Sequence, residues 1–210
     1  MVEVVSMGCA DGSPDDNFRR RGSAFRLDDV HWLTSGHAVA GADTIELLVD
    51  GPDGASRTDV SVSRVDPLND LALLVTGEGP LRPKSRGVST RFRTDPVAPE
   101  DNVTIQTPAA KELSGEVGRV MNASIEAIDG SGPVRRPTIE LLADIESGDS
   151  GSPVMDDAGL VAGVVYGASQ SGDKKAYAVT ANVIEALVRG RSGVDGAGSC
   201  PSRRASTVPE

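Results

Sequence analysis

The chain has 210 residues, of which 31 are acidic and 21 basic, so its formal net charge is -10. This length suits one large domain or two small ones and is enough to bury a sizeable core. An acidic surface repels phosphate backbones, which excludes nucleic acid from the expected partners, and no apolar run is long enough to cross a membrane.

The start of the chain indicates where the protein works. Residues 1–10, MVEVVSMGCA, have neither the basic segment nor the long apolar core of a secretory signal peptide. The two cysteines, Cys9 and Cys200, lie near opposite ends, so the fold is not expected to depend on a disulfide framework. We expect a cytoplasmic protein, or a secreted one if a signal peptide has been removed.

Short runs rich in Val and Leu, separated by clusters of Gly, Pro, Asp and Ser, predict an all-β chain of many short strands. Residues 1–18 are polar and predicted to be loose. Strands follow at 22–34 (two strands around a turn), 44–50, 58–66 and 70–76. The range 58–66 alternates imperfectly, as a kinked strand does. Residues 77–96 show little periodicity, and a linker is predicted at about 81–96.

The second half continues this pattern and closes with a helix. Strands are predicted at 102–108, 113–128, 138–144, 159–168 and 176–180. Residues 181–190 place four apolar side chains on one face and finish on Gly190, which predicts a helix. The Gly-, Ser- and Pro-rich residues 191–210 are predicted to form a disordered tail. The expected architecture is two small β-barrels, at about 20–80 and 97–180, then the helix and the tail.

A serine enclosed by glycines is the most informative local feature. In ESGDSGSPVMDDAGLVAG, residues 146–163, Gly148, Ser150, Gly151 and Pro153 stand within six positions. Two glycines and a proline so close together break any regular element. A backbone that turns this sharply can aim two N–H groups at one point beside the serine hydroxyl, which is the arrangement that acyl transfer requires.

A nucleophilic serine needs a base, and the chain has only two histidines. His37 follows a predicted strand at a glycine-containing turn, whereas His31 lies within that strand and is interpreted as a half-buried strand residue. Asp70 precedes the apolar run 71–74, where a carboxylate is costly unless it is paired, and the His37 Nδ1–H would pair it. Asp66 is the weaker candidate because Pro67 follows it.

The segments WLTSGHAVAG, VDPLNDLALL and GDSGSPV resemble the three signature segments of trypsin-like serine proteases, of the bacterial trypsin-like or HtrA-like branch, in the family's order. The resemblance implies a chymotrypsin-like fold over residues 1–190, with two six-stranded antiparallel β-barrels and the active site between them. It implies Ser150 as nucleophile, His37 as general base and acid, and Asp70 as the residue that orients His37. The N–H groups of Gly148 and Ser150 would form the oxyanion hole. Protein or peptide substrates are expected, with no cofactor and no metal.

The resemblance also suggests residues of the pocket for the substrate side chain before the scissile bond (P1). Asp144 lies six residues before Ser150, where an aspartate selects Lys or Arg in trypsin-like enzymes. Tyr177 falls on the opposite wall and would fill the base of the pocket, leaving Ile145 to line a shallow aliphatic one. We therefore expect a small or medium aliphatic P1 residue, with Lys or Arg as the alternative. An extended substrate would pair with the strand Val164-Val165-Tyr166.

Two questions stay open at the level of sequence. Asp149 either pairs with an internal arginine or is an ordinary turn aspartate. The function is expected to be that of a serine endopeptidase. The alternatives are a protease for one dedicated partner of a bacterial regulatory or defence system, and a catalytically silent trypsin-like domain that binds proteins.

Overall fold

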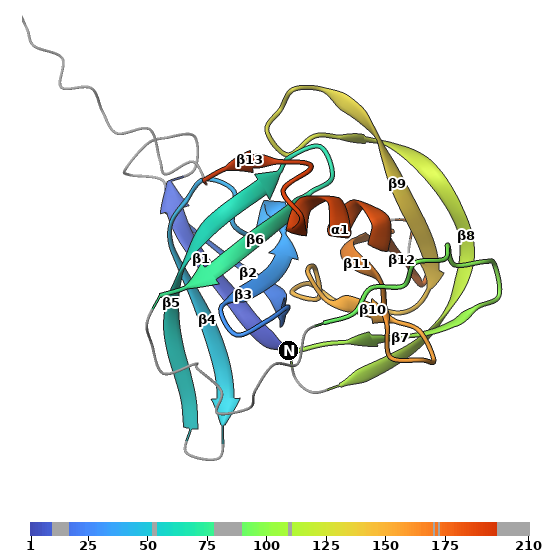
Figure 1. Cartoon of the computed structure of the whole chain (residues 1–210), viewed down its shortest axis with the longest axis horizontal. Helices are drawn as coiled ribbons and strands as arrows, with labels where there is room; N and C mark the ends of the chain where they lie inside the picture. The colour runs from blue at the N-terminus through green and yellow to red at the C-terminus, as the bar shows by residue number, and fades with distance from the viewer. Residues whose placement is uncertain are drawn as a thin grey trace, which may run out of the picture.

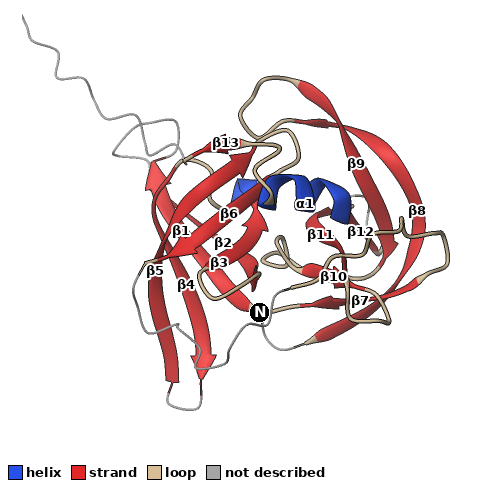
Figure 2. Cartoon of the chain, in the orientation of Figure 1, coloured by secondary structure: helices blue, strands red, loops and turns tan. Residues whose placement is uncertain are grey.

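The computed structural model describes residues 1–9, 17–51, 54–77, 90–108, 111–169, 171 and 173–196. Within them the chain is built almost entirely of strands (Figures 1 and 2). The elements are β1 (Val2–Cys9), β2 (Asn17–Arg26), β3 (His31–Ser35), the 3₁₀ helix η2 (Gly36–Ala38), β4 (Ala42–Gly51), β5 (Gly54–Asp66), β6 (Leu71–Thr76), β7 (Asn102–Gln106), β8 (Glu112–Glu126), β9 (Pro133–Leu142), β10 (Pro153–Met155), β11 (Val161–Ala168), β12 (Lys175–Thr180), α1 (Ala181–Val188) and β13 (Val194–Asp195).

The first half forms an antiparallel sheet in the order β13-β5-β4-β1-β2-β3-β6. Strand β5 pairs with β4 through its first half and with β6 through its second half, which closes six strands into a ring. The register of β5 against β6 shifts between Val62 and Arg64, so the predicted kink is a bulge. Alternate apolar side chains of these strands, among them Val4, Leu47 and Leu74, fill the interior.

The second half forms a closed barrel in the order β10-β11-β12-β9-β8-β7. Its core includes Ile105, Ile139 and Leu141, none of which is exposed to solvent. The predicted all-β, double-barrel fold with a C-terminal helix is therefore confirmed. The helix ends at Val188, two residues before the predicted end.

The two barrels meet along a third apolar cluster, which we call the seam. It joins residues of β2, β3 and β6 to residues of β11 and β12 and to the helix α1, which lies between the barrels in Figure 1. Its members include Phe25, Leu33, Leu71, Val164 and Ile184. Because apolar burial joins the two barrels directly, residues carried by one barrel have fixed positions relative to those carried by the other.

Both ends of the described chain differ from the prediction. Residues 1–18 were expected to be loose, but β1 is an inner strand between β2 and β4. Val2 and Val4 alternate into the core, and the inward hydroxyl of Ser6 donates to the Ala38 carbonyl at 2.5 Å, so this polar residue is satisfied. Within the predicted tail, Val194 and Asp195 pair with β5 as β13. Residues 197–210 of the tail, with Cys200, lie outside the described residues.

The predicted linker is described only from residue 90 onward. There Phe92 forms an isolated parallel bridge with Val161, and the Thr90 N–H donates to the Leu27 carbonyl at 2.9 Å, so this segment runs against both barrels. The one helix of the described chain that reaches two turns has eight residues, and no described helix is long and apolar enough to cross a bilayer.

Candidate active site

His37 lies in the 3₁₀ turn η2 that follows β3, at the rim of the first barrel. Its ring Nδ1 is 2.8 Å from Asp70 Oδ2, and its backbone N–H donates to Asp70 Oδ1 at 2.7 Å. Both oxygens of one carboxylate therefore bind His37, which fixes the ring's orientation and leaves Nε2 for a second partner. The side chain of His37 is 40% exposed, so the ring is only partly covered by the protein.

Asp70 reaches His37 from the connection between β5 and β6, and only 3% of its surface is exposed. Its backbone φ of 56° is in the left-handed region, which non-glycine residues rarely adopt and which is often found at functional sites. The Asp70 carbonyl accepts a hydrogen bond from the Gly36 N–H at 2.9 Å. Asp66 forms no hydrogen bond or ion pair with His37, although both residues are described. Its carboxylate accepts from the backbone and side-chain amides of Asn69 and so stabilises the turn before Asp70.

The loop that carries Ser150 begins with a tight turn over residues 146–149. The Asp149 N–H donates to the Glu146 carbonyl at 3.1 Å, and Gly148 at the third position has a φ of 104°. This combination is a type II turn. A type I turn would have the opposite orientation of the peptide bond between residues 147 and 148. The Gly148 N–H, which is proposed for the oxyanion hole, would then point the opposite way. Asp149 Oδ2 accepts from the Glu146 N–H at 2.8 Å, so Asp149 is a turn residue.

Ser23 of β2 joins this loop to the first barrel. Its N–H donates to the Ser150 carbonyl at 2.7 Å, and its hydroxyl donates to the Gly148 carbonyl at 2.7 Å. The Ser23 carbonyl in turn accepts from the Thr34 hydroxyl at 2.8 Å. A Cβ on Gly151 would lie 1.9 Å from that same carbonyl, so the close approach of the two barrels requires glycine there.

Gly22 shows how near Ser150 is to the turn that carries His37. A Cβ on Gly22 would lie 3.0 Å from the Cβ of Ala38 and 3.1 Å from the carbonyl oxygen of Ser150. Ser150 and η2 are therefore neighbours across the seam, although they are distant in sequence. No hydrogen bond joins the Ser150 hydroxyl to His37 in the described part of the chain.

The three predicted P1 residues lie in different surroundings. The Asp144 side chain is 65% exposed and accepts a hydrogen bond from the Lys174 Nζ at 2.8 Å; this bond and the negative charge of Asp144 raise the pKa of Lys174. Ile145 packs against the core of the second barrel. Tyr177 belongs to the seam and stacks on Tyr166, with ring centroids 6.3 Å apart.

The proposed substrate-pairing strand also needs correction. Val164 lies between β10 and β12 and has partners on both sides. The Val165 N–H donates to the Ser152 carbonyl at 2.9 Å, and its own carbonyl accepts from Gly151 at 2.7 Å and from the Ser35 hydroxyl at 2.9 Å. These backbone groups are already used within the protein, so a substrate strand cannot pair with them. The pairing with β10 ends at Val164, which leaves Tyr166 as the first candidate.

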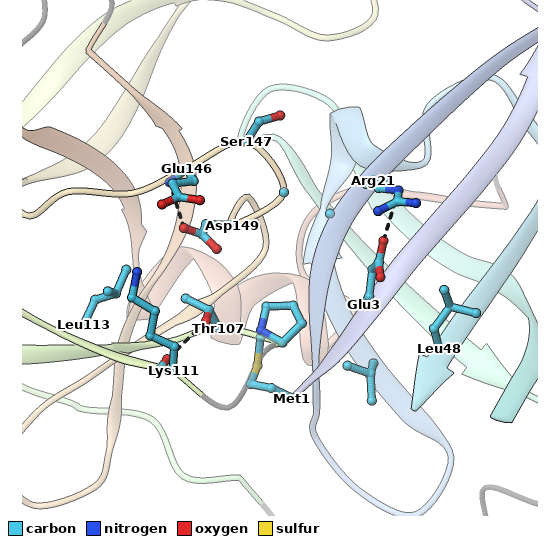
Figure 3. Close-up of a pocket in the computed structure, with 14 residues that line it drawn as sticks. Met1, Glu3, Arg21, Leu48, Thr107, Lys111, Leu113, Glu146, Ser147 and Asp149 are labelled. Carbon is cyan, nitrogen blue, oxygen red and sulfur yellow. Dashed lines mark hydrogen bonds and ion pairs between the residues drawn. The ribbon is translucent and has the colours of Figure 1, made fainter. Parts of the chain in front are cut away.

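A cavity of about 570 Å³ adjoins the 146–149 turn and was not predicted (Figure 3). On one side it is lined by β1 and β2, where Glu3 and Arg21 form an ion pair at 3.3 Å, and on the other by Thr107 and Lys111. Its residues come from both barrels and from the turn, so no local motif identifies it. Within the described residues, no group of three His, Cys, Asp or Glu is placed to bind a metal.

A double β-barrel with a His–Asp pair beside a glycine-flanked serine defines the trypsin-like peptidases. The sequence model described as the trypsin-like peptidase domain matches residues 22–164, and the chain belongs to this family. The match spans most of both barrels. It includes the segments that carry His37, Asp70 and Ser150.

Individual proteases are similar over most of the chain. Serine protease Rv3671c of Mycobacterium tuberculosis is 28% identical over 192 residues, which are 86% of this chain and 45% of that protein. Serine protease Do-like HtrB of Bacillus subtilis is 29% identical over 77% of this chain and 35% of its own length. The chain thus spans less than half of either relative. The crystal structure of the active form of the Rv3671c protease has the same fold, with a TM-score of 0.76 and 24% identity over 96% of this chain and 85% of that one.

Proposed function

We propose that this chain is a serine endopeptidase that hydrolyses peptide bonds through an acyl-enzyme on Ser150. The observation that carries the proposal is the double hydrogen bond between His37 and the buried Asp70, on the turn beside Ser150. Membership of the trypsin-like peptidase family supports it.

In the proposed mechanism, the Ser150 hydroxyl attacks the carbonyl carbon of the scissile bond while His37 Nε2 accepts the hydroxyl proton. Asp70 keeps Nδ1 protonated and stabilises the imidazolium that forms. When the tetrahedral intermediate collapses, the C–N bond breaks and His37 returns its proton to the departing amine. Water then attacks the ester, again with His37 as base, and the acid product leaves with Ser150 restored.

The negative oxygen of each intermediate would be stabilised by the N–H groups of Gly148 and Ser150. Backbone donors that already point at the developing charge need no reorganisation during the reaction, and losing one of them costs about 10²–10³ in turnover. The type II turn at 146–149 and the two hydrogen bonds from Ser23 keep this part of the backbone in one conformation. We infer that the oxyanion hole is organised before substrate binds.

We further propose that the P1 residue is small or medium-sized and aliphatic. A carboxylate selects a basic substrate residue strongly only where water is excluded and no other cation is paired with it. Asp144 is exposed and already paired with Lys174. The aliphatic side chain of Ile145 next to it is the better candidate for contact with substrate.

The proposal is tested by treating the protein with a fluorophosphonate and measuring the intact mass. The expected result is a single adduct that is absent from the Ser150→Ala variant and nearly absent from His37→Gln. The matched control is Ser152→Ala, which removes the next serine of the same loop. An adduct that persists in Ser150→Ala would refute the assignment, and no adduct on the wild type would favour a silent binding domain.

A further inference from the structure

A buried arginine lies behind Asp70. Arg136, on β9 of the second barrel, is only 1% exposed, and its Nη1 is 3.7 Å from Asp70 Oδ2. This is the same oxygen that binds His37 Nδ1. His37, Asp70 and Arg136 thus form a row of three ionisable groups that crosses the seam from the first barrel to the second.

The guanidinium of Arg136 is held in place by further contacts. Its Nε donates to the Leu68 carbonyl at 3.1 Å, two residues before Asp70. Its central carbon lies 4.8 Å from the centre of the Tyr166 ring, a cation–π distance. The hydroxyl of Tyr166 is in turn hydrogen-bonded to Thr138 at 3.1 Å. Nη2 is buried and has no hydrogen-bond partner among the described residues. Within the same residues, the ion pair with Asp70 is the one that Arg136 forms.

A buried carboxylate needs a compensating charge, and the neutral His37 that acts as a base cannot supply it. Burial lowers the pKa of Arg136, while the charges of Asp70, Tyr166 and Asp66 raise it. An arginine stays protonated in proteins even so, and its weakly hydrated guanidinium suits a buried ion pair.

We propose that Arg136 is a positioning residue for the catalytic pair: its charge keeps Asp70 ionised against His37 and sets the pH range in which His37 accepts a proton. The proposal rests on the function proposed above, because it assigns Arg136 a role in that reaction. A cation next to the oxygen that binds Nδ1 disfavours the imidazolium. The enzyme can therefore keep His37 neutral at a lower pH than Asp70 alone would allow.

Other charges around His37 do not substitute for Arg136. From β2, Arg20 binds the His37 and Ala40 carbonyls on the solvent side of the turn. On β1, whose Ser6 contacts the same turn, the acidic residue is Glu3, which is paired with Arg21. Asp66, near Asp70, is bonded to Asn69. Arg136 is the buried cation that contacts Asp70 directly.

The test measures the titration of His37 by NMR, which needs neither substrate nor a reactive serine. Because the chain has only two histidines, His31→Gln leaves His37 as the single imidazole signal. In this background Arg136→Gln is expected to raise the titration midpoint of His37 by about 1 pH unit, given unit charges separated by several Å near a protein surface. Arg136→Lys, which keeps the charge but not the Leu68 bond, should raise it by much less. The control Arg135→Gln removes the neighbouring arginine, which is not buried, and should leave it unchanged.

The pH dependence of the fluorophosphonate acylation rate should change in the same variants as the His37 midpoint. The pH range over which the rate rises should move to higher pH in Arg136→Gln and stay near that of the wild type in Arg136→Lys and Arg135→Gln. An unchanged His37 midpoint in folded Arg136→Gln would overturn the proposal. A shifted midpoint in a protein whose Ser150 never reacts would instead overturn the proposed function and leave the charge relationship standing.

A second comparison serves if Arg136→Gln does not fold. Asp70→Asn leaves the Arg136 cation buried without its partner. The double variant Asp70→Asn, Arg136→Gln removes both charges, so it should melt at the same temperature as Asp70→Asn alone or at a higher one. If Arg136 only fills space, the double variant should melt lower than Asp70→Asn, and that result would overturn the proposal.

Discussion

The hydroxyl of Ser23 donates a 2.7 Å hydrogen bond to the carbonyl of Gly148, across the seam and 125 residues away in sequence. The same residue donates its backbone N–H to Ser150. One residue of the first barrel thus binds both ends of the backbone segment that would form the oxyanion hole in the second.

This relationship predicts that Ser23→Ala slows acylation. The substitution removes the hydroxyl bond to Gly148 and keeps the N–H bond to Ser150, so we expect roughly a fivefold loss in the acylation rate, the equivalent of one net hydrogen bond of about 1 kcal/mol. Stopped-flow acylation with an activated ester would measure it. Ser56→Ala, at an exposed position of β5, is the control and should have no effect. An equal loss in both variants would contradict the assigned role of Ser23.

Gly148→Ala tests whether the type II turn matters for the reaction. A Cβ at Gly148 meets no atom within 4 Å, so the change acts only through its φ of 104°. We expect the turn to change type and the N–H to be lost from the oxyanion hole, with turnover reduced by about 10²–10³. Gly159→Ala is closely matched, because its φ is 72° and its Cβ is equally unobstructed. It should lower the melting temperature to a similar extent and leave turnover unchanged.

The two histidines should differ sharply in their effect on activity. His31 lies 2.8 Å from Asp28 on the surface of the first barrel, whereas His37 binds Asp70. His31→Gln should keep most of the activity, and His37→Gln should lose about 10⁴-fold or more. Because a general base must be neutral, the wild-type rate should rise with pH through the titration of His37. The reverse behaviour of the two variants would show that the base is misassigned.

Cleavage specificity can be read from a denatured proteome by mass spectrometry. We expect cuts after small and medium aliphatic residues, and little change in the Asp144→Ala variant, because Asp144 is exposed and paired with Lys174. Lys174→Ala is the companion variant that frees this carboxylate. Dominant cleavage after Lys and Arg that Asp144→Ala abolishes would make Asp144 the specificity residue. Acylation by the probe without any proteome cleavage would favour a protease for one dedicated partner.

The sequence by itself determined the fold class and pointed to the residues of the candidate site. His37, Asp70 and Ser150 stand in short motifs whose glycines and apolar flanks are local features, so they are recognisable without a structure. The imperfect alternation of 58–66 likewise predicted the bulge of β5, because a bulge interrupts the twofold period within a single strand.

Only the tertiary structure decided which other residues act with that motif. Arg135 and Arg136 are adjacent and identical in sequence, yet only Arg136 is buried against Asp70, because successive side chains of β9 point to opposite faces. Asp144 lies in solvent beside Lys174, and the Ser23 hydroxyl binds the Gly148 carbonyl. Both contacts join segments that are distant in the chain. Such contacts depend on how the two barrels pack against each other, and no local pattern of residues encodes that packing.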